Sequence, residues 1–263
     1  MGFHRGQILP RLDALTFGFK TVLYNGGSSE TIINPPDRSA DITITNYTSG
    51  TSRPIPTLQS NTIADGSGTS AFRIGTGSSK IQTGSITVLL WFNLEGIALN
   101  VGGNNNWRAL FRTTGGTAGY PVTMVLEQAY VINFSTGHSD GYRRYLDSSF
   151  APVSADSNGW QMVTYTYEQS SGNAACYKNS SLIRTGPMTT NTSNGSPTSA
   201  GTALTYSNYT TGGFGVSGTN QVANPNGEGT VPGELGTVLI WNEALSSTEI
   251  TQVYNNTKSQ YGL

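Results

Sequence analysis

Hydrophobic and aromatic residues in this chain come in short runs, and clusters of Gly, Asn, Ser and Thr separate one run from the next. Short apolar runs with turn-forming clusters between them are typical of an antiparallel β-sandwich or barrel. β-Branched and aromatic side chains fill the runs, which favours strands over helices. We expect strands at 85–94, 107–112, 122–134, 142–146, 160–168, 174–178 and 236–242.

The run at 160–168, WQMVTYTYE, is partly apolar on both of its faces. Side chains alternate across a strand, so Trp160 and Met162 fall on one face and Tyr165 and Tyr167 on the other. A strand with one face in water would alternate apolar and polar residues. The pattern therefore predicts a central strand, with an intersheet core on one face and a covered or aromatic surface on the other.

One helix is expected near the C-terminus. Ser246 and Glu249 have the spacing of a capping box, in which Ser246 is the N-cap and Glu249 the third helical residue. Ile250 and Val253 then recur at helical spacing, so one apolar face of this short helix should lie on the sandwich. Gly262 is expected to end it.

The first part of the chain has a different pattern, because prolines and a Gly/Ser-rich stretch at 65–70 interrupt the apolar runs. We interpret 1–50 as an N-terminal arm with irregular edge segments and 51–263 as one sandwich domain. Apolar arm residues would be costly in water, so the arm should pack on its own domain or on a neighbouring subunit. The residues expected at such an interface are Phe3, His4, Arg5, Leu9, Arg11 and Leu12.

The chain carries few charges. Only 11% of its residues are charged and the formal net charge is -1. Such a surface gives no field that would attract nucleic acid or an anionic membrane, so neither is expected as a partner. The longest apolar run, near 86–92, is too short to span a bilayer. The N-terminus lacks the continuous apolar stretch of a secretion signal, so no classical export is expected.

Residues that could carry chemistry are scarce. Cleavage of a glycosidic bond needs two carboxyl groups that flank it, and no Glu here is followed two residues later by Asp, as an E-x-D-x-x-E pair would require. The only histidines are His4 and His138, and His138 is expected to be a solvated loop residue. Cys176 lies in a strand-like run, which favours a buried, inert thiol. We therefore expect no enzyme, no catalytic residue and no cofactor.

A calcium site would need several carboxylate and carbonyl oxygens. Asp140 with Asp147, or Asp37 with Asp41, would supply only two carboxylates, and each pair also fits turn residues that cap backbone amides. No metal site is expected.

Three segments resemble motifs of the laminin-G-like, concanavalin-A-like jelly-roll family. They are the strand NGWQMVTYTY at 158–167, the hairpin AACYKNSSL at 174–182 and the closing segment GELGTVLIWNEALSSTEI at 233–250. In the hairpin, Ser180 stands where the family has a turn glycine. The likeness extends over roughly 70–258. It implies a two-sheet antiparallel jelly-roll sandwich in which these motif residues are structural, with the aromatic residues filling the intersheet core.

The C-terminal sequence at 254–263 and the opening MGFHRG resemble members of this family found in tailed-phage, cyanophage-like virions. This resemblance implies a non-catalytic virion structural protein, either an exposed capsid decoration (cement) protein or a fibre-type component. It would dock through its arm and a sandwich edge on capsid or tail proteins of the same virion, as a homo-oligomer. Its place would be the virion surface, after synthesis in the host cytoplasm without a signal peptide.

The alternative is a carbohydrate-binding module that recognises host-surface glycans. Exposed aromatic and amide side chains in loops would then stack on and hydrogen-bond to a sugar. The residues expected to contact a glycan are Trp107, Tyr142, Arg143 and Tyr209.

Overall fold

The structure is a computed structural model of the whole chain. It describes the backbone of 9–11, 15–19, 29–32, 42–48, 51–52, 71–74, 84–93, 108–114, 122–126, 132–138, 143–146, 159–190, 211–214, 229–230 and 234–263. Side chains are described for 9–11, 84–93, 124, 134–138, 144–146, 159–188 and 237–263.

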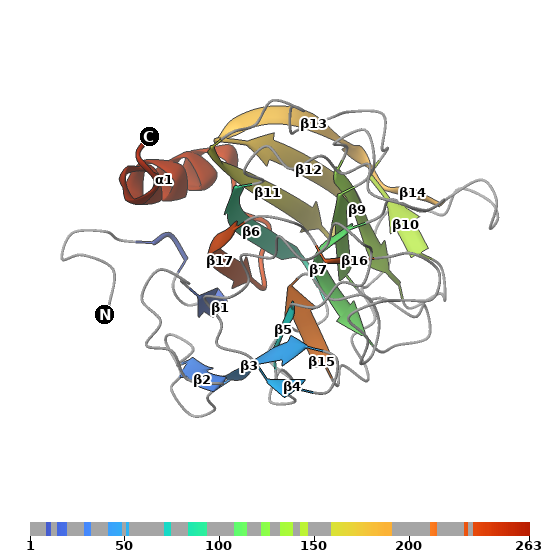
Figure 1. Cartoon of the computed structure of the whole chain (residues 1–263). Coiled ribbons are helices and arrows are strands. Elements are labelled where there is room, and N and C mark those ends of the chain that lie inside the picture. The colour runs from blue at the N-terminus through green and yellow to red at the C-terminus, as the bar shows by residue number, and fades with distance from the viewer. Residues whose placement is uncertain are drawn as a thin grey trace.

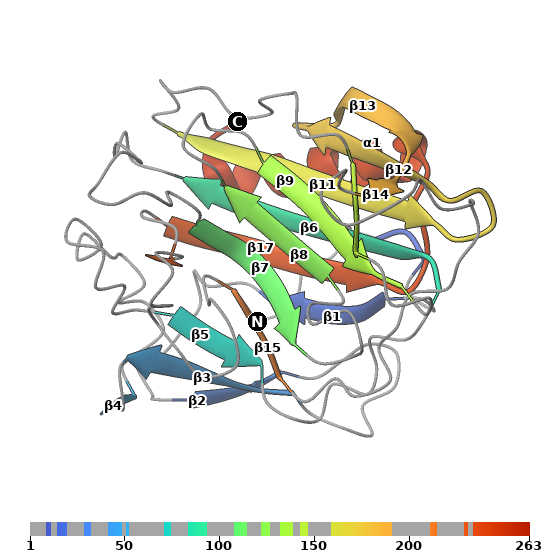
Figure 2. The same cartoon turned by 90° about the vertical axis from the view of Figure 1, so that its right-hand side faces the viewer.

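The described strands form two sheets that lie one over the other, as Figures 1 and 2 show. The first is a six-stranded antiparallel sheet with the order β1-β17-β6-β11-β12-β13. Its strands are β1 (Leu15–Phe19), β6 (Ile86–Asn93), β11 (Trp160–Glu168), β12 (Asn173–Lys178), β13 (Ser181–Pro187) and β17 (Glu234–Trp241).

The second sheet has the order β14-β10-β9-β8-β7-β15-β5-β3-β2, with β16 beside β7 and β4 beside β3. Its strands are β2 (Ser29–Ile32), β3 (Ile42–Thr48), β4 (Thr51–Ser52), β5 (Ala71–Ile74), β7 (Arg108–Thr114), β8 (Val122–Leu126), β9 (Ile132–Gly137), β10 (Arg143–Tyr145), β14 (Thr189–Thr190), β15 (Thr211–Phe214) and β16 (Gly229–Thr230). The prediction of an all-β, two-sheet jelly-roll sandwich with one short C-terminal helix is confirmed.

The expected strand at 122–134 is wrong in one respect. The structure has two antiparallel strands there, β8 and β9, which pair from Val122 with Thr136 to Leu126 with Ile132. Glu127 and Gln128 interrupt the apolar alternation between them. This polar break was a turn signal that the apolar residues on either side obscured.

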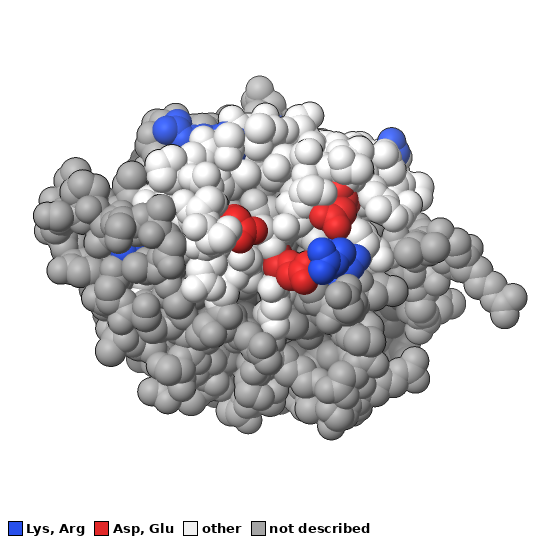
Figure 3. Space-filling view, turned by 180° about the vertical axis from the view of Figure 1, so that it is seen from behind, with Lys and Arg blue, Asp and Glu red and all other residues white. Residues whose placement is uncertain are grey.

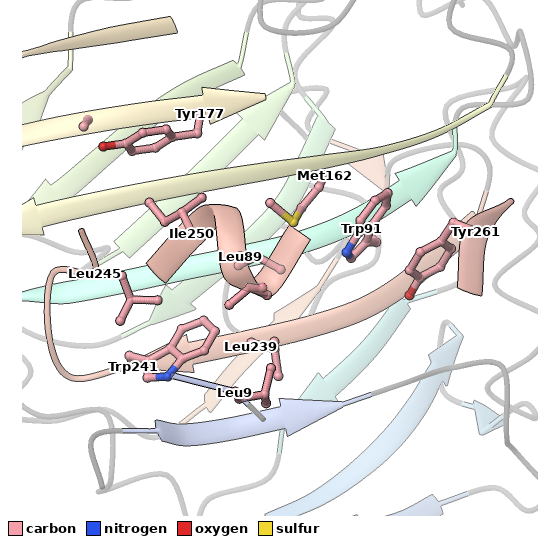
Figure 4. Packing of buried hydrophobic residues seen from close by; sticks show 12 residues of the cluster. Leu9, Leu89, Trp91, Met162, Tyr177, Leu239, Trp241, Leu245, Ile250 and Tyr261 are labelled. Atoms are coloured by element: carbon pink, nitrogen blue, oxygen red, sulfur yellow. The ribbon is translucent and has the colours of Figure 1, made fainter. Parts of the chain in front are cut away.

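Strand β11 is buried on both faces, as its pattern predicted. On the intersheet face, Tyr165 stacks on Phe134 of β9 with 4.6 Å between ring centroids. On the outer face, Met162 belongs to a buried apolar cluster that α1 (Ser247–Thr257) covers. Figure 4 shows this cluster between the sheet and the helix. Trp241 lies here too, so the expectation that the motif aromatics fill the intersheet core is wrong for Trp241.

The capping box predicted for the helix is present. Ser246 Oγ accepts a hydrogen bond from Glu249 N, and Glu249 Oε2 accepts one from Ser246 N at 2.7 Å. Helix α1 is followed by a 3-10 helix, η4 (Lys258–Tyr261), and Gly262 ends the helical segment with φ 75. The left-handed conformation of Gly262 is one that glycine adopts without steric cost.

The β12–β13 hairpin turns at Asn179 and Ser180, both of which have positive φ, 48 and 70. A two-residue turn of this kind favours Asn-Gly, so Ser180 replaces glycine at some conformational cost. Asn179 Oδ1 accepts a hydrogen bond from Met162 N at 2.8 Å, which ties the turn to β11. No helix in the described residues is long and apolar enough to cross a membrane.

Candidate functional site

Two of the residues predicted for a subunit interface contact this chain's own domain. Leu9 is buried in the outer apolar cluster beside Trp241, as Figure 4 shows, and Trp241 Nε1 donates a hydrogen bond to Pro10 O at 3.0 Å. Arg11 is exposed and forms an ion pair with Glu243 at 2.6 Å. The other interface residues lie outside the described part of the chain: Phe3, His4, Arg5 and Leu12.

The backbone after this segment also joins the sandwich. Strand β1 pairs with β17 at the edge of the six-stranded sheet, and β2 pairs with β3 at the edge of the second sheet. The domain boundary at residue 50, and docking of the arm on another subunit, stay predictions.

The structure describes only the backbone of Arg143 among the residues predicted to contact a glycan, whereas Trp107, Tyr142 and Tyr209 lie outside the described residues. The strands next to them still constrain where a site could form. β10 and β15 run in the same direction and β7 runs opposite, because each neighbouring pair from β10 to β15 is antiparallel. β10 and β15 are four strands apart, about 19 Å at the usual strand spacing. The first residues of β7, β10 and β15 therefore do not come together at one point.

The expectation of a solvated His138 is wrong, because the side chain is fully buried at 0% exposure. The loop-like sequence after it hid the fact that His138 continues the inner face of β9, two residues beyond Thr136. Its Nε2 lies 2.8 Å from Thr136 Oγ1, and its ring meets the edge of Tyr167 from the other sheet. Arg144, directly opposite Thr136 on β10, is also buried. Polar groups thus lie inside the intersheet layer.

Cys176 is buried and free, as the sequence predicted. Burial raises the pKa of its thiol to about 12, and the side-chain hydrogen bond with Tyr165 lowers it by less. Burial likewise raises the pKa of Tyr165. A thiol held in this state is not a nucleophile at neutral pH.

Each carboxylate whose side chain is described makes a contact that stabilises the fold. Glu168 Oε1 accepts hydrogen bonds from Ser85 Oγ at 3.1 Å and Ser170 Oγ at 2.9 Å, which fixes the turn after β11. Glu249 completes the capping box, and Glu243 pairs with Arg11. Figure 3 shows that most of the described surface seen from behind is neither acidic nor basic. Within the residues that the structure describes, no three His, Cys, Asp or Glu side chains gather as metal ligands would.

A column of four aromatic rings at one end of the outer face is the most developed surface feature of the described residues. Trp91 of β6 stacks on Tyr254 of α1 at 5.8 Å and on Tyr261 of η4 at 4.3 Å, and Tyr261 packs against Trp160 of β11 at 4.6 Å. Trp91 and Tyr261 are buried, whereas Tyr254 and Trp160 at the two ends are partly exposed.

The local sequence pattern does not reveal this column, because its members come from four elements. The one available signal was the presence of two aromatic residues seven positions apart in the C-terminal helical segment, Tyr254 and Tyr261. Their partners on β6 and β11 lie about a hundred residues or more away in the sequence, so only the fold brings them together.

The comparisons with known proteins agree with this architecture. The binding domain of botulinum neurotoxin serotype D/C has a TM-score of 0.52 and 13% sequence identity, over 93% of this chain and 52% of that chain. The binding domain of botulinum neurotoxin serotype D has a TM-score of 0.51 and 12% identity, over 93% and 52% of the two chains. The chain thus spans about half the length of these proteins, and at this identity the likeness concerns the fold alone. No curated protein matches the sequence.

A family model matches 65–251, which is most of the chain and nearly the whole region where the motifs were found. The match includes β6, β11, the β12–β13 hairpin and the start of α1. The chain therefore belongs to the laminin-G-like family of the concanavalin A-like lectin/glucanase superfamily.

Proposed function

We propose that this protein is a non-catalytic carbohydrate-binding module. Its superfamily joins lectins, which bind sugars, with glucanases, which cleave them. Cleavage with a pair of carboxylic acids requires both groups to flank one glycosidic bond. The observation that carries the proposal is that Glu168, Glu243 and Glu249, the carboxylates whose side chains are described, are each engaged in a structural contact.

The surface chemistry supports a neutral ligand. Only 11% of the chain is charged, so the affinity for a partner would come from aromatic stacking and hydrogen bonds to amides and hydroxyls rather than from ion pairs. Carbohydrates match such a surface, because a pyranose ring has an apolar C–H face and a rim of hydroxyls.

An array of neutral and acidic glycans probed with the full chain tests this proposal, together with an assay for new reducing ends on the glycans that bind. We expect binding without turnover. Glu168→Gln serves as a control and should bind as the unchanged chain does. Turnover that disappears when one carboxylate is replaced would contradict the non-catalytic proposal, and an array without any bound glycan would contradict carbohydrate binding.

A second function, attachment to other proteins of a phage particle, is favoured by a separate observation. Strand β13 is an edge of the six-stranded sheet, and it exposes Leu182 at 52% and Ile183 at 40%. Exposed apolar residues on an edge strand are typical of a protein contact. We propose this edge as the docking surface for capsid or tail proteins, at the virion surface.

Occupancy of the chain in purified particles, measured by mass spectrometry, tests this second function. Replacing Leu182 and Ile183 by Ser should lower occupancy severalfold, while Thr185→Ala on the same strand should not. Equal occupancy for all three proteins would exclude the β13 edge. Deleting residues 1–20 is a less selective test, because it also removes Leu9 and β1 from the domain.

A further inference from the structure

The end of the aromatic column at Trp160 has the chemistry of a sugar-binding site. Three tryptophans have described side chains, and two of them use their indole N–H inside the protein. Trp91 Nε1 donates to Thr257 Oγ1 at 3.1 Å, and Trp241 Nε1 donates to Pro10 O at 3.0 Å. Trp160 is partly exposed, and no described residue accepts a hydrogen bond from its N–H.

The residue before Trp160 is a glycine with open space at its Cβ position. This residue, Gly159, has φ 141, and a Cβ placed on it would meet no atom within 4 Å. Asn93, directly opposite Trp160 on β6, accepts a hydrogen bond from Gly159 N through its Oδ1 at 3.1 Å. The half-buried side chain of Asn93 and the backbone of one glycine therefore lie next to Trp160.

The ring under Trp160 is fixed in place. Tyr261 OH accepts a hydrogen bond from Thr237 N at 2.6 Å and donates one to Thr237 Oγ1 at 2.7 Å. Burial raises the pKa of this Tyr261 hydroxyl, so it stays protonated at neutral pH. A platform whose geometry is already set loses little conformational entropy when a ligand stacks on it.

The column is also unequal in charge at its two ends. Lys258 Nζ lies over the Tyr254 ring at 5.3 Å from its centroid, at the end away from Trp160. The Trp160 end offers an aromatic face, an N–H donor and an amide. This combination suits the C–H face and hydroxyl rim of an uncharged pyranose better than an anion or a cation.

We propose that Trp160 and Asn93 form a binding site for one neutral pyranose unit of a glycan. The sugar stacks on the exposed part of the Trp160 ring, and one of its hydroxyl oxygens accepts the indole N–H. This site rests on the proposed carbohydrate-binding function and gives that function a location at the Trp160 end of β11.

Titration of the full chain with the strongest neutral glycan from the array tests the site. Trp160→Phe keeps a ring but removes the N–H donor and should weaken binding about tenfold, as expected for the loss of one hydrogen bond and some stacking area. Trp160→Ala should abolish measurable binding. Leu182→Ser changes an exposed apolar residue elsewhere and should leave the dissociation constant unchanged.

The signal of the Trp160 indole N–H in ¹⁵N NMR spectra, assigned by its absence in Trp160→Phe, should shift when this glycan is added. Unfolding midpoints of each variant show whether the fold is kept. Binding that is unaffected by both Trp160 variants, or a selection of acidic glycans only, would overturn this site but leave the carbohydrate-binding function standing. An array on which no glycan binds would overturn both.

Discussion

The two faces of the six-stranded sheet are buried in different ways. The intersheet face meets a second sheet, and polar groups such as Thr136, His138 and Arg144 lie inside that layer. None of the described strands lies against the outer face. It is covered by α1 and by Leu9, so segments near the two chain ends cover an apolar and aromatic surface. A β-sandwich can thus have two cores, one built by strands and one built by terminal segments.

Two indoles of the outer layer donate hydrogen bonds to the segments that cover it. In the outer layer the indoles of Trp91 and Trp241 donate to Thr257 and to Pro10, which belong to the covering segments. The covering segments therefore contribute polar partners as well as apolar area, which satisfies donors that burial would otherwise leave unpaired.

The largest expected effect comes from removing one large ring from each layer. Trp241→Ala and Phe134→Ala should each lower the free energy of unfolding by about 3–5 kcal/mol, because each creates a cavity at a fully buried position. Urea denaturation measures both, and Leu182→Ala at an exposed position should change stability by less than about 0.5 kcal/mol. A loss below about 1 kcal/mol for Trp241→Ala would show that the outer layer is only a loose cover.

Alkaline pH should weaken the intersheet layer. Cys176 has a pKa of about 12 in the folded chain against an ordinary value of 9.0, so the folded state keeps a proton that the unfolded state loses. The stability that depends on the protonated Cys176 thiol is fully present below about pH 9 and is lost as the pH rises toward 12. The slope should reach at most about 1.4 kcal/mol per pH unit for this group.

Unfolding curves measured between pH 8 and pH 11 follow this loss. The free energy of unfolding of Cys176→Ala should decline less steeply with pH than that of the unchanged chain. Part of the decline should remain in this variant, because burial also raises the pKa of Tyr165. An equal decline in the unchanged chain and in Cys176→Ala would mean that the thiol does not contribute.

A smaller effect is expected at the start of the helix that covers the outer face. Ser246→Ala removes the side-chain oxygen that accepts from Glu249 N and should lower stability by about 1 kcal/mol. Thr248→Ala, an exposed change in the same turn, is the matched control and should be nearly neutral. Thermal unfolding of both variants distinguishes a cap effect from a general effect of shortening side chains in this turn.

The smallest effect is expected at the Arg11–Glu243 pair. Both side chains are more than a third exposed, so Arg11→Ala should cost only about 0.2–1 kcal/mol, and less at high salt. The difference in the free energy of unfolding between the unchanged chain and Arg11→Ala should become smaller as the ionic strength is raised. A cost above about 2 kcal/mol would mean that Arg11 itself anchors the covering segment.

Local sequence patterns predicted much of the fold. The apolar pattern of 160–168 predicted a strand buried on both faces, and the spacing of Ser246 and Glu249 predicted the helix start, because each depends on neighbours a few residues away. His138 and Trp241 were misplaced for the opposite reason. Whether a residue at a strand end or in a closing motif is buried, and in which layer, depends on distant segments that no local pattern specifies.

The candidate site also has one part that the local sequence predicts and another part that depends on distant segments. The motif around 158–167 identified Trp160 as part of a structural strand, but its partners in the aromatic column come from η4 and β6. The aromatic residues that the sequence favoured for a glycan contact lie outside the described residues, and the strands that follow them in the chain, β7, β10 and β15, begin at different places in the second sheet.

Strand β17 lies between β1 and β6, and its residues come last among the strands in chain order. During synthesis on the ribosome, β6 must therefore wait for one of its two neighbouring strands, and the outer face of β6 and β11 must wait for α1, until residues 234–257 have emerged. Such late closure, with contacts across more than two hundred residues, slows folding and exposes intermediates to aggregation. Production of this protein should consequently depend on slow translation, low temperature or chaperones more than its final stability would indicate.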